Sequence, residues 1–174
     1  GETFAALRAH VPAVKAAVSP ESAFPIGLRL SQRAASEVDV DAQSAFRDWL
    51  AEVDCFVPTL NGFPYGSFHG TRVKENVYLP DWRSAARAAY TRRLADLLAD
   101  WLPAGVTGSI STVPIGFKRV VGAAEMAAVQ RQLSSVLLHL QQLRERGKTI
   151  ILALEPEPGC VLETTAEVCR FFDE

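Results

Sequence analysis

The chain has 174 residues, which is the size of one ordinary domain. Hydrophobic residues make up 48% and charged residues 22%, so the composition is that of a globular protein and excludes disordered, collagen-like and coiled-coil chains. Eighteen Lys and Arg against twenty Asp and Glu give a net charge of −2, and no basic run is present that would neutralise a phosphate backbone. We therefore expect one domain, residues 1–174, that does not bind nucleic acid.

The cysteines and the apolar runs indicate a compartment. Cys55, Cys160 and Cys169 form no C-x-x-C pair and leave an odd thiol, which favours neither a disulfide framework nor a thiolate zinc site. The longest apolar runs are far shorter than the ~20 residues of a membrane-spanning helix, and no signal peptide opens the chain. We expect a cytoplasmic protein that does not insert into a membrane.

The first predicted elements alternate between helix and strand. Apolar residues three or four apart predict an opening amphipathic helix, which Pro12 would bend or split. A short strand is expected over Ile26–Ser31, followed by a helix with Asp41 as its N-cap. The next strand is expected over Cys55–Leu60, where Pro58 indicates an edge, an end or a bulge. The stripe of the opening helix consists of Phe4, Leu7, Val11, Val14 and Val18.

A long connection over residues 61–82 follows, rich in Gly, Pro and aromatic residues, and loops of this length are often functional. Asp81 is the predicted N-cap of a helix that carries Trp82 and Trp101 on its apolar stripe and is ended by Pro103 with Gly105. Strands are then expected over Ser109–Val113 and Thr149–Leu154.

A long helix separates these two strands and stops at Gly147. Thr164 and Glu167 form a capping box that opens a last helix. The alternation predicts an α/β fold, in which a parallel sheet is covered by helices. Four strands fit an open, doubly wound sheet by count, because a β/α barrel has eight strands and about 250 residues. Periodicity does not separate that sheet from an incomplete barrel.

Several strings resemble one family: NGFPYGSFHG, VKENVYLPDW, GSISTVPIGFK, and LALEPEPGC with LETT. The chain resembles the EboE-like metabolite traffic proteins, which look like members of the xylose isomerase-like TIM-barrel superfamily of sugar phosphate isomerases and epimerases. The resemblance spans nearly the whole chain and implies an incomplete (β/α) TIM barrel, with the four strands corresponding to strands two through five. It implies that the molecule is larger than these residues, or that copies pair as a homo-oligomer to cover the open sheet edges.

The resemblance also implies a divalent metal ion, Zn, Mn or Mg. In the superfamily a glutamate at the end of the fifth strand joins later Asp, His and Glu residues around the metal, and Glu155 matches that position. Alternation along the strand puts Ile151, Ala153 and Glu155 on one face, so Glu155 would point toward the barrel mouth. Glu157 is a weaker candidate. A carboxylate that faces solvent or caps a helix is an equal alternative.

Five further residues are candidates for the site: His69 and Lys118 for catalysis, and Asn61, Tyr65 and Lys74 for substrate binding. A loop histidine can bind metal or move a proton, and lysines at a strand carboxyl end can hold a phosphate or a sugar hydroxyl. The asparagine can donate an amide hydrogen bond, and the tyrosine can form part of an apolar wall. The ordinary alternatives are a hydrogen-bonded histidine, solvated lysines, an Asn–Gly turn and a loop anchored by its aromatic residues.

Two functions follow from the resemblance. The first is a metal-dependent isomerase or epimerase that acts on a sugar or polyol. The second is a non-catalytic metabolite-binding protein of a natural-product export pathway. No G-x-G-x-x-G, Walker, G-x-S-x-G or H-E-x-x-H motif is present, which removes the familiar dinucleotide, nucleotide, serine hydrolase and zincin interpretations.

Overall fold

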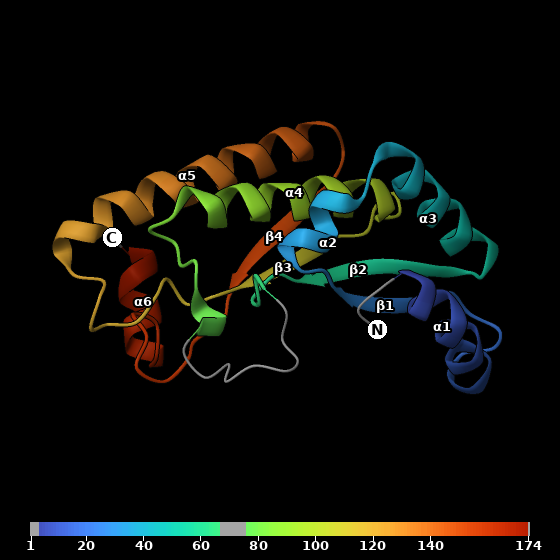
Figure 1. Cartoon of the computed structure of the whole chain (residues 1–174), viewed down its shortest axis with the longest axis horizontal. Coiled ribbons are helices and arrows are strands. Elements are labelled where there is room, and N and C mark those ends of the chain that lie inside the picture. The colour runs from blue at the N-terminus through green and yellow to red at the C-terminus, as the bar shows by residue number, and fades with distance from the viewer. Residues whose placement is uncertain (1–3, 67–75, 174) are drawn as a thin grey trace.

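A computed structural model of the chain describes residues 4–66 and 76–173. Within these residues, four parallel strands form one sheet in which each strand lies beside the next one along the chain (Figure 1). This confirms a parallel sheet that alternates with helices, and the strand order lacks the reversal of a doubly wound sheet. The strands are β1 (Phe24–Arg29), β2 (Cys55–Asn61), β3 (Gly108–Thr112) and β4 (Ile150–Leu154).

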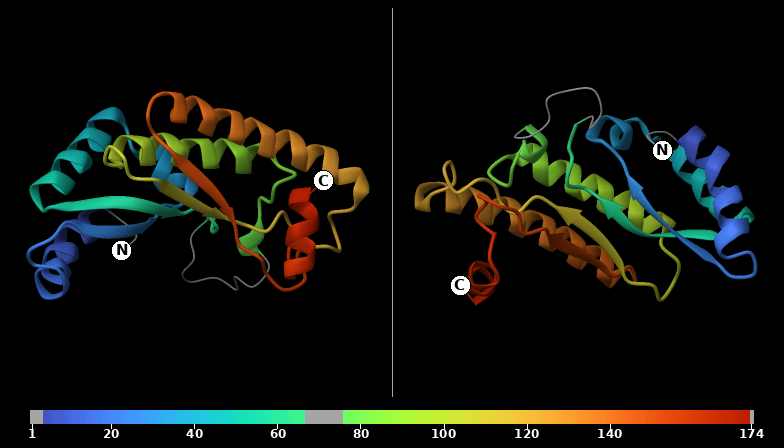
Figure 2. Two further views of the ribbon diagram at one scale, coloured as in Figure 1. Left: turned by 180° about the vertical axis from the view of Figure 1, so that it is seen from behind. Right: turned by 90° about the horizontal axis from the view of Figure 1, so that it is seen from below.

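The helices between the strands all lie on one face of the sheet, as the two views of Figure 2 also show. None of the described helices is both long and apolar enough to cross a bilayer. The helices are α1 (Phe4–Val18), α2 (Gln32–Glu37), α3 (Val40–Glu52), α4 (Ala85–Trp101), α5 (Ala123–Glu145) and α6 (Thr165–Asp173), and a 3-10 turn covers Asn76–Tyr78.

The main core lies between the sheet and these helices. Alternate strand residues such as Leu28, Val57 and Ile110 are buried, and α4, which contacts β2 and β3, has its Leu94 and Leu98 fully buried. The opposite face of the sheet, which we call the open face, is not covered by the helices that connect the strands, α2 to α5, and Ile151 on it is 55% exposed. One face of the sheet therefore forms the core, and the other face does not.

The helix ends differ in part from the sequence predictions. The N-cap of α3 is Asp39, whose Oδ1 accepts from the backbone N of Ala42 at 2.8 Å, so the prediction of Asp41 was wrong by two residues. The N-cap of α4 is Ser84 rather than Asp81, because the Asp81 carboxylate binds Arg83 instead. The capping box of α6 is confirmed. The carboxylate of Glu167 accepts from the backbone N of Thr164 at 2.8 Å, and the Thr164 hydroxyl accepts from the backbone N of Glu167 at 3.3 Å.

The N-terminal third shows three further differences. Strand β1 begins and ends two residues earlier than expected, which leaves room for α2, a helix of six residues that is too short to show a periodic pattern. Helix α1 continues through Pro12, so the expected split of this helix at the proline is wrong. Its expected apolar stripe is only partly buried, since Val14 is 48% and Val18 68% exposed.

Gly62 offers a sharp test of the packing between β2, β3 and α4. A Cβ at this position would lie 2.9 Å from Leu94 Cδ1 and 2.9 Å from the backbone O of Ser111. We expect Gly62→Ala to lower the free energy of unfolding by about 1–3 kcal/mol in urea denaturation, because overpacking forces the neighbours apart. The control is Gly66→Ala, where an added Cβ has nothing within 4 Å. Equal stability of the two variants would contradict the described packing.

Candidate functional site

Two rows of side chains in register across the four strands line the open face, and most of these side chains are small or polar. Ser109 donates its hydroxyl to the Thr59 hydroxyl at 2.9 Å, which shows that these two side chains share this face. Because paired residues of parallel strands point the same way, the register fixes the rest of the face. One row is Gly27, Thr59, Ser109 and Ile151, and the row nearer the carboxyl ends is Arg29, Asn61, Ser111 and Ala153.

Asn61 closes β2 at this second row. Its Oδ1 accepts from the backbone N of Phe63 at 3.0 Å, so the residue forms the turn that the Asn–Gly pair indicates. The side chain is exposed, and the turn uses only its oxygen. The turn does not use the side-chain NH₂ group.

Glu155 directly follows β4. Its backbone N donates to the O of Thr112 at 3.0 Å, which continues the pairing with β3. Alternation puts its half-buried side chain on the same face as Ala153, at the carboxyl edge. Among the described residues, no group of three or more His, Cys, Asp or Glu is arranged to hold a metal ion. The described residues thus place the Glu155 carboxylate at this edge and do not form a complete metal site.

The loops after β2, β3 and β4 are joined to one another at this edge. Trp82, which is fully buried, donates its backbone N to the O of Ile115 at 3.0 Å and its Nε1 to the O of Val113 at 3.2 Å. The loop after β3 then bonds to the loop after β4, because the backbone N of Val161 donates to the O of Gly116 at 2.9 Å. The three loops beside the candidate site are therefore hydrogen-bonded to one another.

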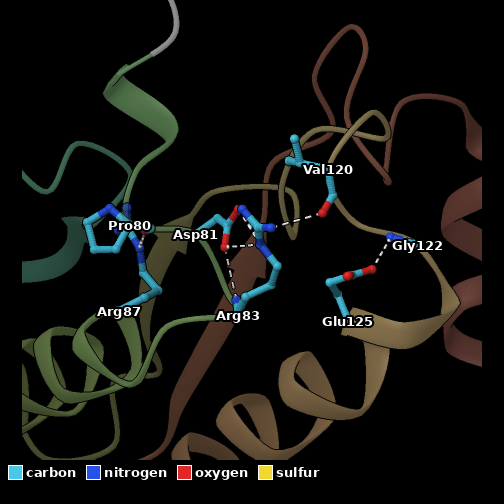
Figure 3. A network of polar contacts seen from close by, with 7 residues as sticks. All are labelled: Pro80, Asp81, Arg83, Arg87, Val120, Gly122 and Glu125. Atoms are coloured by element: carbon cyan, nitrogen blue, oxygen red, sulfur yellow. Dashed lines mark hydrogen bonds and ion pairs between the residues drawn. The ribbon is translucent and has the colours of Figure 1, made fainter.

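An ion pair between a buried carboxylate and a half-buried arginine strengthens the first of these junctions (Figure 3). Asp81 is 4% exposed, and its carboxylate accepts from Nε of Arg83 at 3.0 Å and from Nη2 at 2.8 Å. Nη1 of Arg83 donates to the O of Val120 at 2.9 Å, in the loop after β3. The hydrogen bond with Asp81 raises the pKa of Arg83. The pair thus connects the start of α4 to the neighbouring loop.

Lys118 occupies a different environment from the one that the sequence suggests. Its Nζ lies 2.6 Å from a carboxylate oxygen of Glu167 and also binds Glu163, both at the beginning of α6. Its backbone N donates to the O of Gly159 at 3.0 Å. In the structure Lys118 therefore joins the loop after β3 to the beginning of α6.

Tyr65 also lies apart from the open face. Its ring packs edge-on against Tyr90, with 5.2 Å between the centroids, and it lines a cavity of about 280 Å³ between α2 and α4. Gln32 and Arg93 line the same cavity, on the helix side of the sheet. The remaining two candidates, His69 and Lys74, lie outside the described residues. The structure thus brings Asn61 and Glu155 to one edge of the sheet, places Tyr65 against α4, and pairs Lys118 with two carboxylates at the beginning of α6.

Sequence reasoning missed the serine and threonine side chains of the open face. The signal was present in the pattern Ser109, Ile110, Ser111, where polar and apolar residues alternate as they do in a strand with two different faces. It also missed Arg87, which is fully buried although it lies in a helical pattern. Comparison of the chain with family models, with curated proteins and with solved structures finds no match in any of the three.

The ion pairs of Lys118 predict a pH dependence. The hydrogen bond with Lys118 is the main cause that lowers the pKa of Glu167 to about 2. This folded-state pKa is below the unfolded value of about 4.3. The ion pair therefore contributes to the stability of the folded state above about pH 4.3, and this contribution is lost as the pH falls toward 2. We expect the Glu167 carboxyl resonance of Lys118→Met to titrate at a higher pH than in wild type, as measured by NMR. Lys15→Met, a lysine remote from α6, is the control, and an unchanged titration in Lys118→Met would contradict the assignment.

Proposed function

We propose that this chain is part of a β/α barrel that binds a sugar or polyol on its open face, and that the protein is a metal-dependent isomerase or epimerase. The observation that carries the proposal is the polar row at the carboxyl ends of the strands, with one carboxylate at its end. In such barrels each strand pairs with the next, the helices form an outer ring, and active sites sit at the carboxyl edge. The consecutive strand order and the one-sided helix layer support this architecture.

A groove beside β4 gives further support. It has a volume of about 780 Å³ and lies between α5 and the unpaired edge of β4. Leu137 and Ile151, which line it, are each 55% exposed. On their other side, α5 packs against α4 and β4 pairs with β3. A further helix and strand of a barrel would pack against α5 and β4 in the same way, and they would fill this groove.

Hydrogen exchange of the intact protein tests the barrel. The backbone N of Glu155 bonds to β3, so the amides of Leu152 and Leu154 point to the outer edge of β4 by alternation. In a closed barrel a neighbouring strand accepts from them, and we expect strong protection of both amides in NMR exchange. Exchange of these two amides as fast as in an unpaired segment, with the Glu155 amide still protected, would contradict closure.

The chemistry of the open face suits a polyhydroxylated ligand. Asn61, Ser111 and Glu155 offer an amide donor, a hydroxyl and a carboxylate acceptor near one another along the edge. Gly27 and Ala153 leave room above the sheet because their side chains are small. In the proposed enzyme Glu155 is one metal ligand, and the further ligands come from outside the described residues.

The alternative is a protein that binds the metabolite without converting it. One observation favours it: of the five polar side chains in the two rows, four are neutral hydroxyl or amide groups, namely those of Thr59, Asn61, Ser109 and Ser111, and the fifth is the cation of Arg29. The neutral groups hydrogen-bond to a polyol, but they are not effective general acids or bases near neutral pH. Turnover of a bound sugar separates the two proposals.

Metal content tests the role of Glu155 directly. We expect the intact protein, dialysed against Mn²⁺, to retain bound metal by elemental analysis, and Glu155→Gln to lose at least 90% of it, because the amide keeps the shape and removes the anionic ligand. The matched control is Glu157→Gln, two residues further on, which should retain the metal. Equal metal content in wild type and Glu155→Gln would sink the assignment. Retained xylitol binding without any metal would favour the binding protein over the isomerase.

A further inference from the structure

Arg87 is a fully buried cation that holds both ends of the long connection between β2 and α4. It lies in the first turn of α4, and its Nη1 donates to the O of Gly62 at 2.7 Å. Its Nε donates to the O of Pro80, also at 2.7 Å, as Figure 3 shows. One guanidinium therefore fixes the residue after Asn61 and the residue before Asp81, which are far apart in sequence. A planar group with several fixed donors is needed for two such contacts at once.

The surroundings of Arg87 keep its side chain in one place. Its Cζ lies 5.7 Å from the ring centroids of both Tyr65 and Tyr90. Burial lowers the pKa of Arg87 to about 10, so the side chain still carries its charge at neutral pH. Its hydrogen bonds to the two carbonyls are therefore charge-assisted, which makes them shorter and stronger than bonds between neutral groups.

The contact with Gly62 lies one residue away from the open face. The N of Gly62 donates to the O of Ser111 at 2.9 Å, while its O accepts from Arg87. The residue has no free space for a side chain, since a Cβ would meet Leu94 and Ser111. Asn61 precedes this fixed residue, and its Oδ1 accepts from the N of Phe63, which follows it. The direction of the Asn61 amide is thus set from behind the sheet.

We propose that Arg87 is a positioning residue for the ligand site on the open face. It acts through Gly62 on Asn61, and it does not touch the ligand. A buried cation lowers the stability of the fold, and here Nη2 of Arg87 has no hydrogen-bond partner among the described residues to offset this cost. A methionine of similar volume would avoid that cost, and it would lose both carbonyl contacts. The part of the inference that concerns affinity rests on the proposed function.

Arg93 provides a matched control on the same helix. Its Nε donates to the O of Ala35 at 3.1 Å, and its Nη2 donates to the O of Val38. It therefore also holds backbone carbonyls from α4, but those of α2 and the residue after it. Its replacement should affect stability without an effect on Asn61.

The experiment compares Arg87→Lys and Arg93→Lys in the intact protein with two readouts. The first is the side-chain amide resonance of Asn61 in a ¹⁵N-labelled sample without ligand, and the second is the dissociation constant for xylitol by calorimetry. We expect Arg87→Lys to shift the Asn61 resonance and to weaken xylitol binding about tenfold, because the compact ammonium of a lysine does not reach two separate carbonyls as the planar guanidinium does. Arg93→Lys should change neither readout. Where Arg87→Lys does not fold, Arg87→Gln, which keeps a donor without the charge, carries the same comparison.

The outcomes separate this inference from the proposed function. An unmoved Asn61 resonance and an unchanged dissociation constant in a folded Arg87 variant would overturn the positioning role. Equal losses in Arg87→Lys and Arg93→Lys would overturn it too, since they would show a general loss of stability. A shifted Asn61 resonance in a protein whose wild type binds no xylitol supports the positioning role and counts against the proposed ligand class alone.

Discussion

The arrangement of the loops at the carboxyl edge of the sheet depends on the two hydrogen bonds of the buried Trp82. It donates to one carbonyl after β3 through its Nε1, while its backbone donates to another, so the connection from β2 cannot move without the loop after β3. That loop is in turn bonded to the one after β4. Because ligand-binding residues of a parallel sheet lie on these connections, a rigid junction among three of them gives the open face a fixed rim.

Helix α4 relates the core to the candidate site. Its leucines fill the core against β2 and β3, and its first turn carries Arg87, which bonds to Gly62 behind Asn61. The helix thus packs the sheet from one side and sets the direction of a polar side chain on the other. This division explains why one face of the sheet is apolar and buried while the opposite face carries hydroxyl and amide groups.

Local patterns predicted the strands and long helices well, because periods of two and of three to four residues reflect which side of each element is buried. They were wrong about the N-cap of α4, because the Asp81 carboxylate binds Arg83, two residues later. They also did not show contacts that are distant in sequence, such as the ion pair of Lys118 with Glu163, 45 residues later. The burial of Arg87 depends on carbonyls from both ends of a long loop. The site rows needed the register of four strands, and the resemblance that suggested an isomerase finds no support in the comparisons.

The central claim is that the open face of this sheet is the inner, ligand-binding wall of a barrel. The most direct measurement is a crystal structure of the intact protein soaked with Mn²⁺ and xylitol. The account predicts an anomalous peak for the metal beside the Glu155 carboxylate, and the polyol within hydrogen-bond distance of Asn61 and Ser111. Metal and polyol bound elsewhere, with the open face turned to bulk solvent, would contradict it.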